Sequence, residues 1–123
     1  MREEALQKIY NSVSGRASFS AGAFCAALAD WEVTPVFDAG EIIGGVLSKD
    51  NEIHIGVERP FHFSGRRYIR EVLQKTIDKY GFAITTVQPQ NSGGLKFCKR
   101  LGFVEIGERA GNILLRCDRS NYK

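Results

Sequence analysis

The chain has 123 residues, of which 43% are apolar and 25% charged, and 17 Lys and Arg against 14 Asp and Glu give a net charge of +3. We expect one globular domain over residues 1–123. No apolar run approaches the ~18 residues of a membrane span, and the opening Met1-Arg2-Glu3-Glu4 lacks the pattern of a secretory signal. Three widely separated cysteines outside any CxxC pair argue against a disulfide framework and a zinc site. These features predict a cytoplasmic protein with reduced thiols, no bound metal and no membrane partner.

The first half of the chain indicates two helices followed by three strands. Apolar residues at helical spacing predict one helix over residues 2–13 and a second from the cap Ser20 to Trp31, stopped by Thr34-Pro35. Runs rich in β-branched residues predict strands over residues 33–37, 42–47 and 52–57. Turn residues separate these runs, so we expect three antiparallel strands.

The second half indicates a crossover and a final hairpin. It predicts a helix from about Ser64 to Tyr80, a central apolar strand over residues 82–87, and a short helix from Asn91 to Gly102. Two last strands, 103–106 and 112–117, flank a turn at residues 108–111. A strand, a helix and another strand imply at least one parallel pair, so the expected fold is α+β with a mixed, mostly antiparallel sheet.

The stretch from Val87 to Gly107 resembles a segment of the GCN5-related N-acetyltransferases (GNAT). In that family a strand leads to an Asn, a small residue three positions on, an aromatic-Tyr pair, and Gly-Phe after the helix. The corresponding positions are Asn91, Gly94, Phe97 with Cys98, and Gly102 with Phe103. The resemblance implies a three-layer fold with helices on both faces of the sheet, and acetyl-CoA as cofactor. The first strand of the family is missing, because a helix is predicted almost from Met1.

The resemblance also implies a set of cofactor-binding residues. The family's pyrophosphate loop precedes its long helix, and here Ser64 takes the first motif position while Arg67 and Ile69 replace two glycines. Arginines at this helix N-terminus suit a phosphate, although such a run is also typical of a solvated helix face. Asn91 can likewise be a helix cap alone. The implied cofactor-binding residues are Val57, Ser64, Gly65, Arg66, Arg67, Tyr68, Thr86, Asn91 and Phe97.

Three residues are candidates for catalysis. Cys98 occupies the position of the Tyr that protonates the departing thiolate in many family members, but it also fits a small apolar core position. Glu52 and His54 lie two residues apart on a predicted strand, so they share a face and either could accept an amine proton. An exposed strand face explains both residues equally well.

Several functions fit these residues. One is acetyl transfer from acetyl-CoA to a primary amine of a small molecule or protein. The last strands could pair across a homodimer, although no residue requires it. The alternative is an inactive acetyltransferase-like structural or binding protein, because compact divergent versions resemble bacteriophage proteins, including virion components and host-interaction proteins. Nucleic-acid binding by the arginine run is a third, less favoured interpretation.

Overall fold

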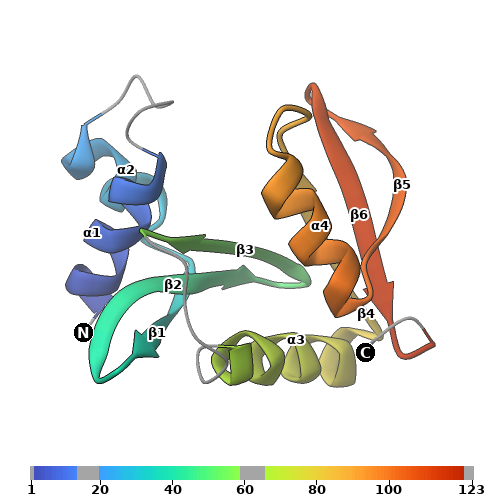
Figure 1. Cartoon of the computed structure of the whole chain (residues 1–123), viewed down its shortest axis with the longest axis horizontal. Helices are drawn as coiled ribbons and strands as arrows, with labels where there is room; N and C mark the ends of the chain where they lie inside the picture. Colours follow the sequence, from blue (N-terminus) through green and yellow to red (C-terminus); the bar gives the residue numbers. More distant parts are fainter. Residues whose placement is uncertain (1, 14–19, 59–65, 121–123) are drawn as a thin grey trace. The chain divides into compact units, whose positions relative to one another are not determined.

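The computed structural model describes residues 2–13, 20–58 and 66–120 and gives a mixed α+β fold (Figure 1). The sheet has the strand order β1-β2-β3-β4-β6-β5, in which β3 and β4 are parallel and the pairs β1–β2, β4–β6 and β5–β6 are antiparallel. The mixed, mostly antiparallel sheet and its parallel pair are therefore confirmed. The elements in chain order are α1 (Arg2–Val13), α2 (Ala21–Ala27), β1 (Glu32–Asp38), β2 (Glu41–Lys49), β3 (Glu52–Val57), α3 (Arg66–Tyr80), β4 (Phe82–Val87), α4 (Ser92–Leu101), β5 (Val104–Arg109) and β6 (Asn112–Asp118).

The chain divides into two units. Unit 1 consists of Met1–Lys49 and His54–Val72, and unit 2 consists of Asp50–Ile53 and Leu73–Lys123. Both β3 and α3 contribute residues to each unit. None of the described helices is long and apolar enough to cross a membrane.

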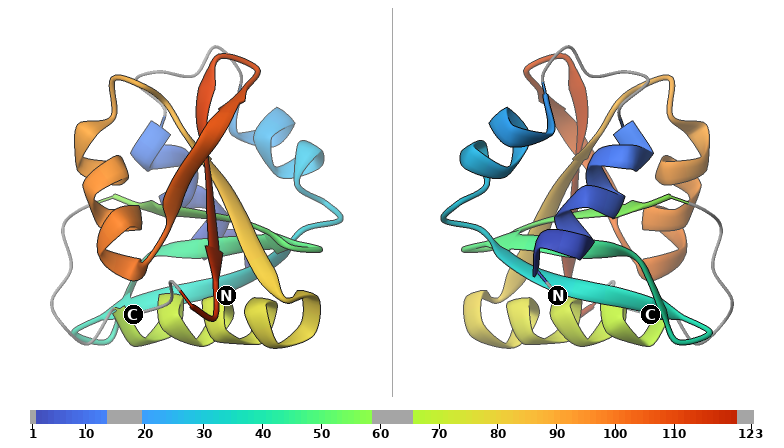
Figure 2. Two further views of the ribbon diagram at one scale, coloured as in Figure 1. Left: turned by 90° about the vertical axis from the view of Figure 1, so that its right-hand side faces the viewer. Right: turned by 90° about the vertical axis from the view of Figure 1, so that its left-hand side faces the viewer.

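Unit 1 is built from the β1–β2 hairpin and the helices α1 and α2. The hairpin closes through Ala39 and Gly40, whose φ angles of 53° and 83° provide the backbone twist that a two-residue turn requires. Pro35 can lie within β1 because β1 is the edge strand of the sheet. The helix α1 packs against β2 (Figure 2). The buried residues of α1 include Ala5 and Ile9.

Unit 2 is built around β4, α4 and the β5–β6 hairpin, which is strongly twisted (Figure 2). The hairpin closes through Ala110 and Gly111, again with positive φ angles, 53° and 83°. The helix α4 ends at Gly102, which has a φ of 112°, the left-handed conformation that its position after the helix predicts. The buried apolar side chains of this unit are Ile53, Leu73, Ile77, Ala83, Val87, Cys98, Leu101, Phe103, Leu115 and Cys117.

Two predicted boundaries are wrong. The second helix ends at Ala27 rather than continuing to Trp31, and Thr34-Pro35 lies inside β1 instead of stopping the helix. After Ala27 the chain forms a turn in which the Trp31 N–H donates to the Leu28 carbonyl oxygen at 3.0 Å. Apolar residues in this turn still contact the core, so their spacing reflects burial rather than helix. The last hairpin also turns later than predicted, because β5 continues to Arg109.

Candidate functional site

The strand β4 has different neighbours along its two edges. All of its residues are in antiparallel register with β6. The parallel register with β3 joins Glu52 to Ile84, whose N–H donates to the Asn51 carbonyl oxygen at 2.8 Å. Among the described residues, Thr85, Thr86 and Val87 therefore have register partners in β6 alone. A second extended segment can pair with the other edge of β4 at this point.

Asn91 begins α4 just after this strand. Its side-chain oxygen accepts a hydrogen bond from the Gly94 N–H at 3.0 Å, and its own N–H donates to the Gln88 carbonyl oxygen at 2.9 Å. A Cβ added at Gly94 would lie 2.6 Å from the Asn91 side-chain nitrogen, so the small residue three positions on makes room for the cap. The helix-cap role of Asn91 is confirmed. A contact between Asn91 and a cofactor stays a prediction.

The predicted Phe97 and Cys98 pair lies in the middle of α4. Phe97 is half-buried, whereas Cys98 is buried with Leu101 on the inner stripe of the helix. Burial raises the pKa of the Cys98 thiol to about 11, from an ordinary value of 9.0. The thiol is therefore protonated at neutral pH, which disfavours a thiolate nucleophile. Its role as an acid stays a prediction.

Glu52 and His54 each have a partner. The Glu52 carboxylate accepts a hydrogen bond from the guanidinium of Arg109 at 2.9 Å, within unit 2. The His54 ring lies against the Trp31 indole, with 5.7 Å between ring centroids and an angle of 50° between the planes, within unit 1. The two residues of the predicted pair thus differ in environment, one ionic and the other aromatic.

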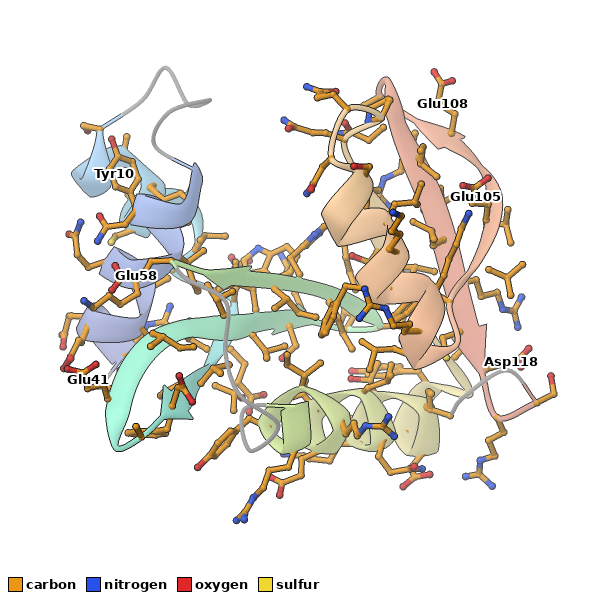
Figure 3. The ribbon with its side chains drawn as sticks, in the orientation of Figure 1. Tyr10, Glu41, Glu58, Glu105, Glu108 and Asp118 are labelled. Carbon is orange, nitrogen blue, oxygen red and sulfur yellow. The ribbon has the colours of Figure 1, made fainter. Side chains whose placement is uncertain are left out.

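The remaining cofactor predictions fall at the end of β3 and the start of α3. Val57 is half-buried, and the next residue, Glu58, is held by α1: its carboxylate accepts from Lys8 at 2.8 Å and from Asn11 at 3.1 Å (Figure 3). Arg67 is exposed, with its guanidinium carbon 5.7 Å from the centre of the Tyr68 ring. Ser64 and Gly65 lie outside the described residues, as does the side chain of Arg66.

Comparison with known proteins gives a clear likeness only at the level of structure. No protein-family model and no curated protein matches the chain. The PaiA N-acetyltransferase from Thermoplasma acidophilum in complex with coenzyme A is 15% identical, with 94% of this chain and 89% of that chain covered at a TM-score of 0.60. A ribosomal-protein-alanine N-acetyltransferase from Brucella melitensis is 14% identical, with 94% and 93% covered at a TM-score of 0.70. A GNAT family acetyltransferase from Elizabethkingia anophelis with acetyl-CoA bound is 18% identical, with 83% and 85% covered at a TM-score of 0.62.

The chain has the GNAT fold. The fold expected from residues 87–107 and from the order of elements is therefore confirmed. Among the described residues the first element is α1.

The predicted site residues of this GNAT fold are divided between the two units. Unit 2 contains the predicted catalytic residues Glu52 and Cys98, together with Thr86, Asn91 and Phe97. Unit 1 contains His54, Val57, Arg67 and Tyr68. In the described part of the chain, no group of three or more His, Cys, Asp or Glu is placed to hold a metal ion.

Two partners of the predicted catalytic residues were missed by sequence reasoning. Arg109 was placed in a turn, and it lies 57 positions from Glu52 in the chain. Trp31 was placed at the end of a helix, with no indication that it contacts His54. Neither pair carries a local sequence signal, because both arise from the pairing of segments that are distant in sequence.

Proposed function

We propose that this chain is an acetyl-CoA-dependent N-acetyltransferase that acts on a primary amine. The observation that carries the proposal is the register of β4 within the GNAT fold. In the part of the chain that the structure describes, residues 85–87 follow the parallel register position Glu52–Ile84 and have register partners in β6 alone. In the family, the strand at this place pairs its backbone with the pantetheine arm of acetyl-CoA. The likeness to structures that hold coenzyme A or acetyl-CoA supports the same use here.

The reaction requires that the protein orient the two reactants, and two protons must move. The amine nitrogen attacks the thioester carbonyl carbon, so a carbon–nitrogen bond forms and the carbon–sulfur bond breaks. One proton leaves the nitrogen and one proton reaches the departing thiolate, which gives an amide and a free thiol. Holding the amine against the thioester supplies much of the rate, and a positioned base adds to it.

Each predicted residue has a place in this proposal. The backbone of β4 around Thr86 would bind the extended arm of acetyl-CoA, and Asn91 would fix the turn that follows. The arginines at the start of α3, including Arg67, would bind phosphate. Val57, Ser64, Gly65, Arg66, Tyr68 and Phe97 remain cofactor-binding predictions.

Binding of acetyl-CoA tests the proposal directly. At a hundredfold excess over Kd, a ligand of the folded state adds about 2.7 kcal/mol to stability, which a thermal-shift assay detects readily. Asn91→Ala removes both the cap and any cofactor contact, whereas Asn91→Asp keeps a good cap and changes only the amide. We expect acetyl-CoA to bind the wild type in the micromolar range and to bind both variants more weakly. No response to millimolar acetyl-CoA in calorimetry and thermal shift would refute the proposal.

A second candidate function is a binding or structural protein on the same fold without catalysis. Its support is the burial of Cys98 at the position where many members of the family carry the Tyr that protonates the departing thiolate. Binding of acetyl-CoA without acetyl transfer to any of a panel of amines, followed by mass spectrometry, would favour this second function. Transfer to any amine would exclude it.

A further inference from the structure

The ion pair between Arg109 and Glu52 joins strands that are not neighbours, because β4 and β6 lie between β3 and β5. Glu52 is level with Ile84 of β4. Arg109 pairs with Asn112, one residue beyond the level of Val87. In a flat sheet the two Cα atoms would be about 14 Å apart across the strands and about 13 Å apart along them, which is beyond the reach of the two side chains. The 2.9 Å contact therefore requires the tip of the twisted β5–β6 hairpin to bend over the sheet (Figure 2).

The bend brings the Arg109 guanidinium to one face of β4. Register partners point to the same face of a sheet, and successive residues of a strand point to opposite faces. The register of Glu52 with Ile84 thus puts these two side chains and that of Thr86 on one face. This face of β4 is half-buried, whereas the opposite face is buried. Because the guanidinium contacts Glu52, it lies on the half-buried face, next to the part of β4 that has register partners in β6 alone among the described residues.

Arg109 retains hydrogen-bonding capacity for a ligand. A guanidinium carries five N–H donors in a planar fork that matches a carboxylate. Among the described residues its partner is Glu52, which accepts a hydrogen bond from one terminal nitrogen at 2.9 Å. The Arg109 side chain is 47% exposed and that of Glu52 is 22% exposed. Glu52 therefore restrains the head group, and the second terminal nitrogen can donate to an anion.

We propose that Arg109 binds a carboxylate of the acceptor, which is therefore an amino acid or another amine with a carboxylate near its nitrogen. The inference rests on the proposed N-acetyltransferase function and names its substrate class. The arm of acetyl-CoA would lie along residues 85–87, so the amine has to approach this stretch of β4. The Arg109 guanidinium lies beside the same stretch, and Glu52 is its positioning residue.

The charges of the ion pair also suit such an acceptor. Glu52 and Arg109 present an anion and a cation side by side, 2.9 Å apart. An amino acid carries an ammonium and a carboxylate on the same carbon atom, so the two sets of charges are complementary. An acceptor without the carboxylate makes no hydrogen bond to the guanidinium, and hydrogen bonds to charged groups are among the stronger ones in proteins.

Matched acceptors test the inference. Each pair consists of an amino acid and its amide, which differ in the carboxylate. The measured quantity is the ratio of kcat/KM for the acid to kcat/KM for the amide. We expect Arg109→Gln to lower this ratio about tenfold relative to the wild type. Comparing the two proteins cancels the difference in amine basicity between the acid and the amide.

Two further variants separate the role of each partner. Arg119 is the matched control, because it is another exposed arginine of unit 2 that pairs with a carboxylate, that of Asp78 at 3.1 Å. Arg119→Gln should leave the ratio unchanged. Glu52→Ala should lower the ratio in the same direction as Arg109→Gln. Loss of a base would instead lower kcat for both acceptors and leave the ratio unchanged, so an unchanged ratio would overturn the positioning role of Glu52.

The outcomes distinguish the inference from the proposed function. Thermal unfolding first checks that each variant keeps the fold. Acetyl transfer by the wild type, with the wild-type ratio kept in a folded Arg109→Gln variant, would overturn the carboxylate site and leave the proposed function standing. Transfer to the amides and to none of the acids would have the same meaning. A wild type that binds no acetyl-CoA and transfers no acetyl group would refute the proposed function, and the inference with it.

Discussion

Gly44 on β2 is a position where the structure leaves no room for a side chain. A Cβ added there would overlap the Gly56 carbonyl oxygen and would lie 2.7 Å from the Val57 Cα and 2.9 Å from the Gly56 carbonyl carbon. All three atoms are backbone atoms of β3, so no side chain can rotate to make space. Gly44→Ala is therefore expected to push the end of β3 away from β2.

The size of the effect follows from the contacts that would be strained. Overpacking a rigid site costs about 1–3 kcal/mol. Moving β3 also strains the hydrogen bond from the Glu58 N–H to the Ile43 carbonyl oxygen, which measures 2.9 Å, and losing such a bond costs about 1 kcal/mol. The sum predicts a loss of about 2–4 kcal/mol for Gly44→Ala, or roughly 8–16 °C in Tm for a chain of this size.

Two other glycines provide matched controls. At Gly93 an added Cβ meets nothing within 4 Å, and the residue lies in α4, so Gly93→Ala should stabilise by about 0.5–1 kcal/mol. At Gly45 the new Cβ would lie 3.1 Å from the Ile9 side chain and 3.1 Å from the Thr34 carbonyl oxygen, so an intermediate loss is expected. Urea denaturation followed by circular dichroism measures all three variants. A Gly44→Ala variant as stable as Gly93→Ala would refute the close approach of β2 and β3.

Three further predictions concern single side chains. Because the pKa of Cys98 is raised from 9.0 to about 11, its contribution to stability is complete below pH 9 and is lost as the pH rises toward 11. The unfolding free energy of Cys98→Ala should therefore fall less than that of the wild type over this pH range. An equal fall in both proteins would contradict burial of the thiol. Asn91→Ala should cost about 1 kcal/mol by loss of the cap, with Asn91→Asp near the wild type in the same urea titration. Val104 and Ile106 on the edge strand β5 are 48% and 54% exposed. For a homodimer that pairs through β5, Ile106→Lys should convert the dimer to a monomer, as measured by light scattering. A monomeric wild type would contradict this prediction.

Local patterns predicted those parts of the fold that local physics determines. The bounds of α1, β3 and β4 match the predicted ones, because each has a complete apolar pattern between clear turn residues. The cap at Asn91 and the left-handed Gly102 also follow from residue type and spacing alone. The end of α2 was missed because Leu28 and Trp31 keep helical spacing while packing on the core from a turn.

The candidate site was predicted less completely, because its contacts are long-range. The sequence indicated Glu52 and His54 as a pair with one role, whereas each is tied to a distant segment with different chemistry. No periodicity within β3 distinguishes a carboxylate that faces Arg109 from an imidazole that faces Trp31. The choice between them as a proton acceptor therefore depends on tertiary contacts.

The distribution of charge between the two units bears on how the arginines at the start of α3 attract anions. Unit 1, which contains Arg59, Arg66, Arg67 and Arg70, has eight Lys and Arg against eight Asp and Glu, whereas unit 2 has nine against six. The net +3 of the chain thus belongs to unit 2 and not to the arginine run. A balanced unit produces little long-range attraction beyond the Debye length of about 10 Å at 0.1 M salt. In the proposed function these arginines would bind an anion at contact distance, such as a single pyrophosphate, rather than attract a long polyanion from a distance.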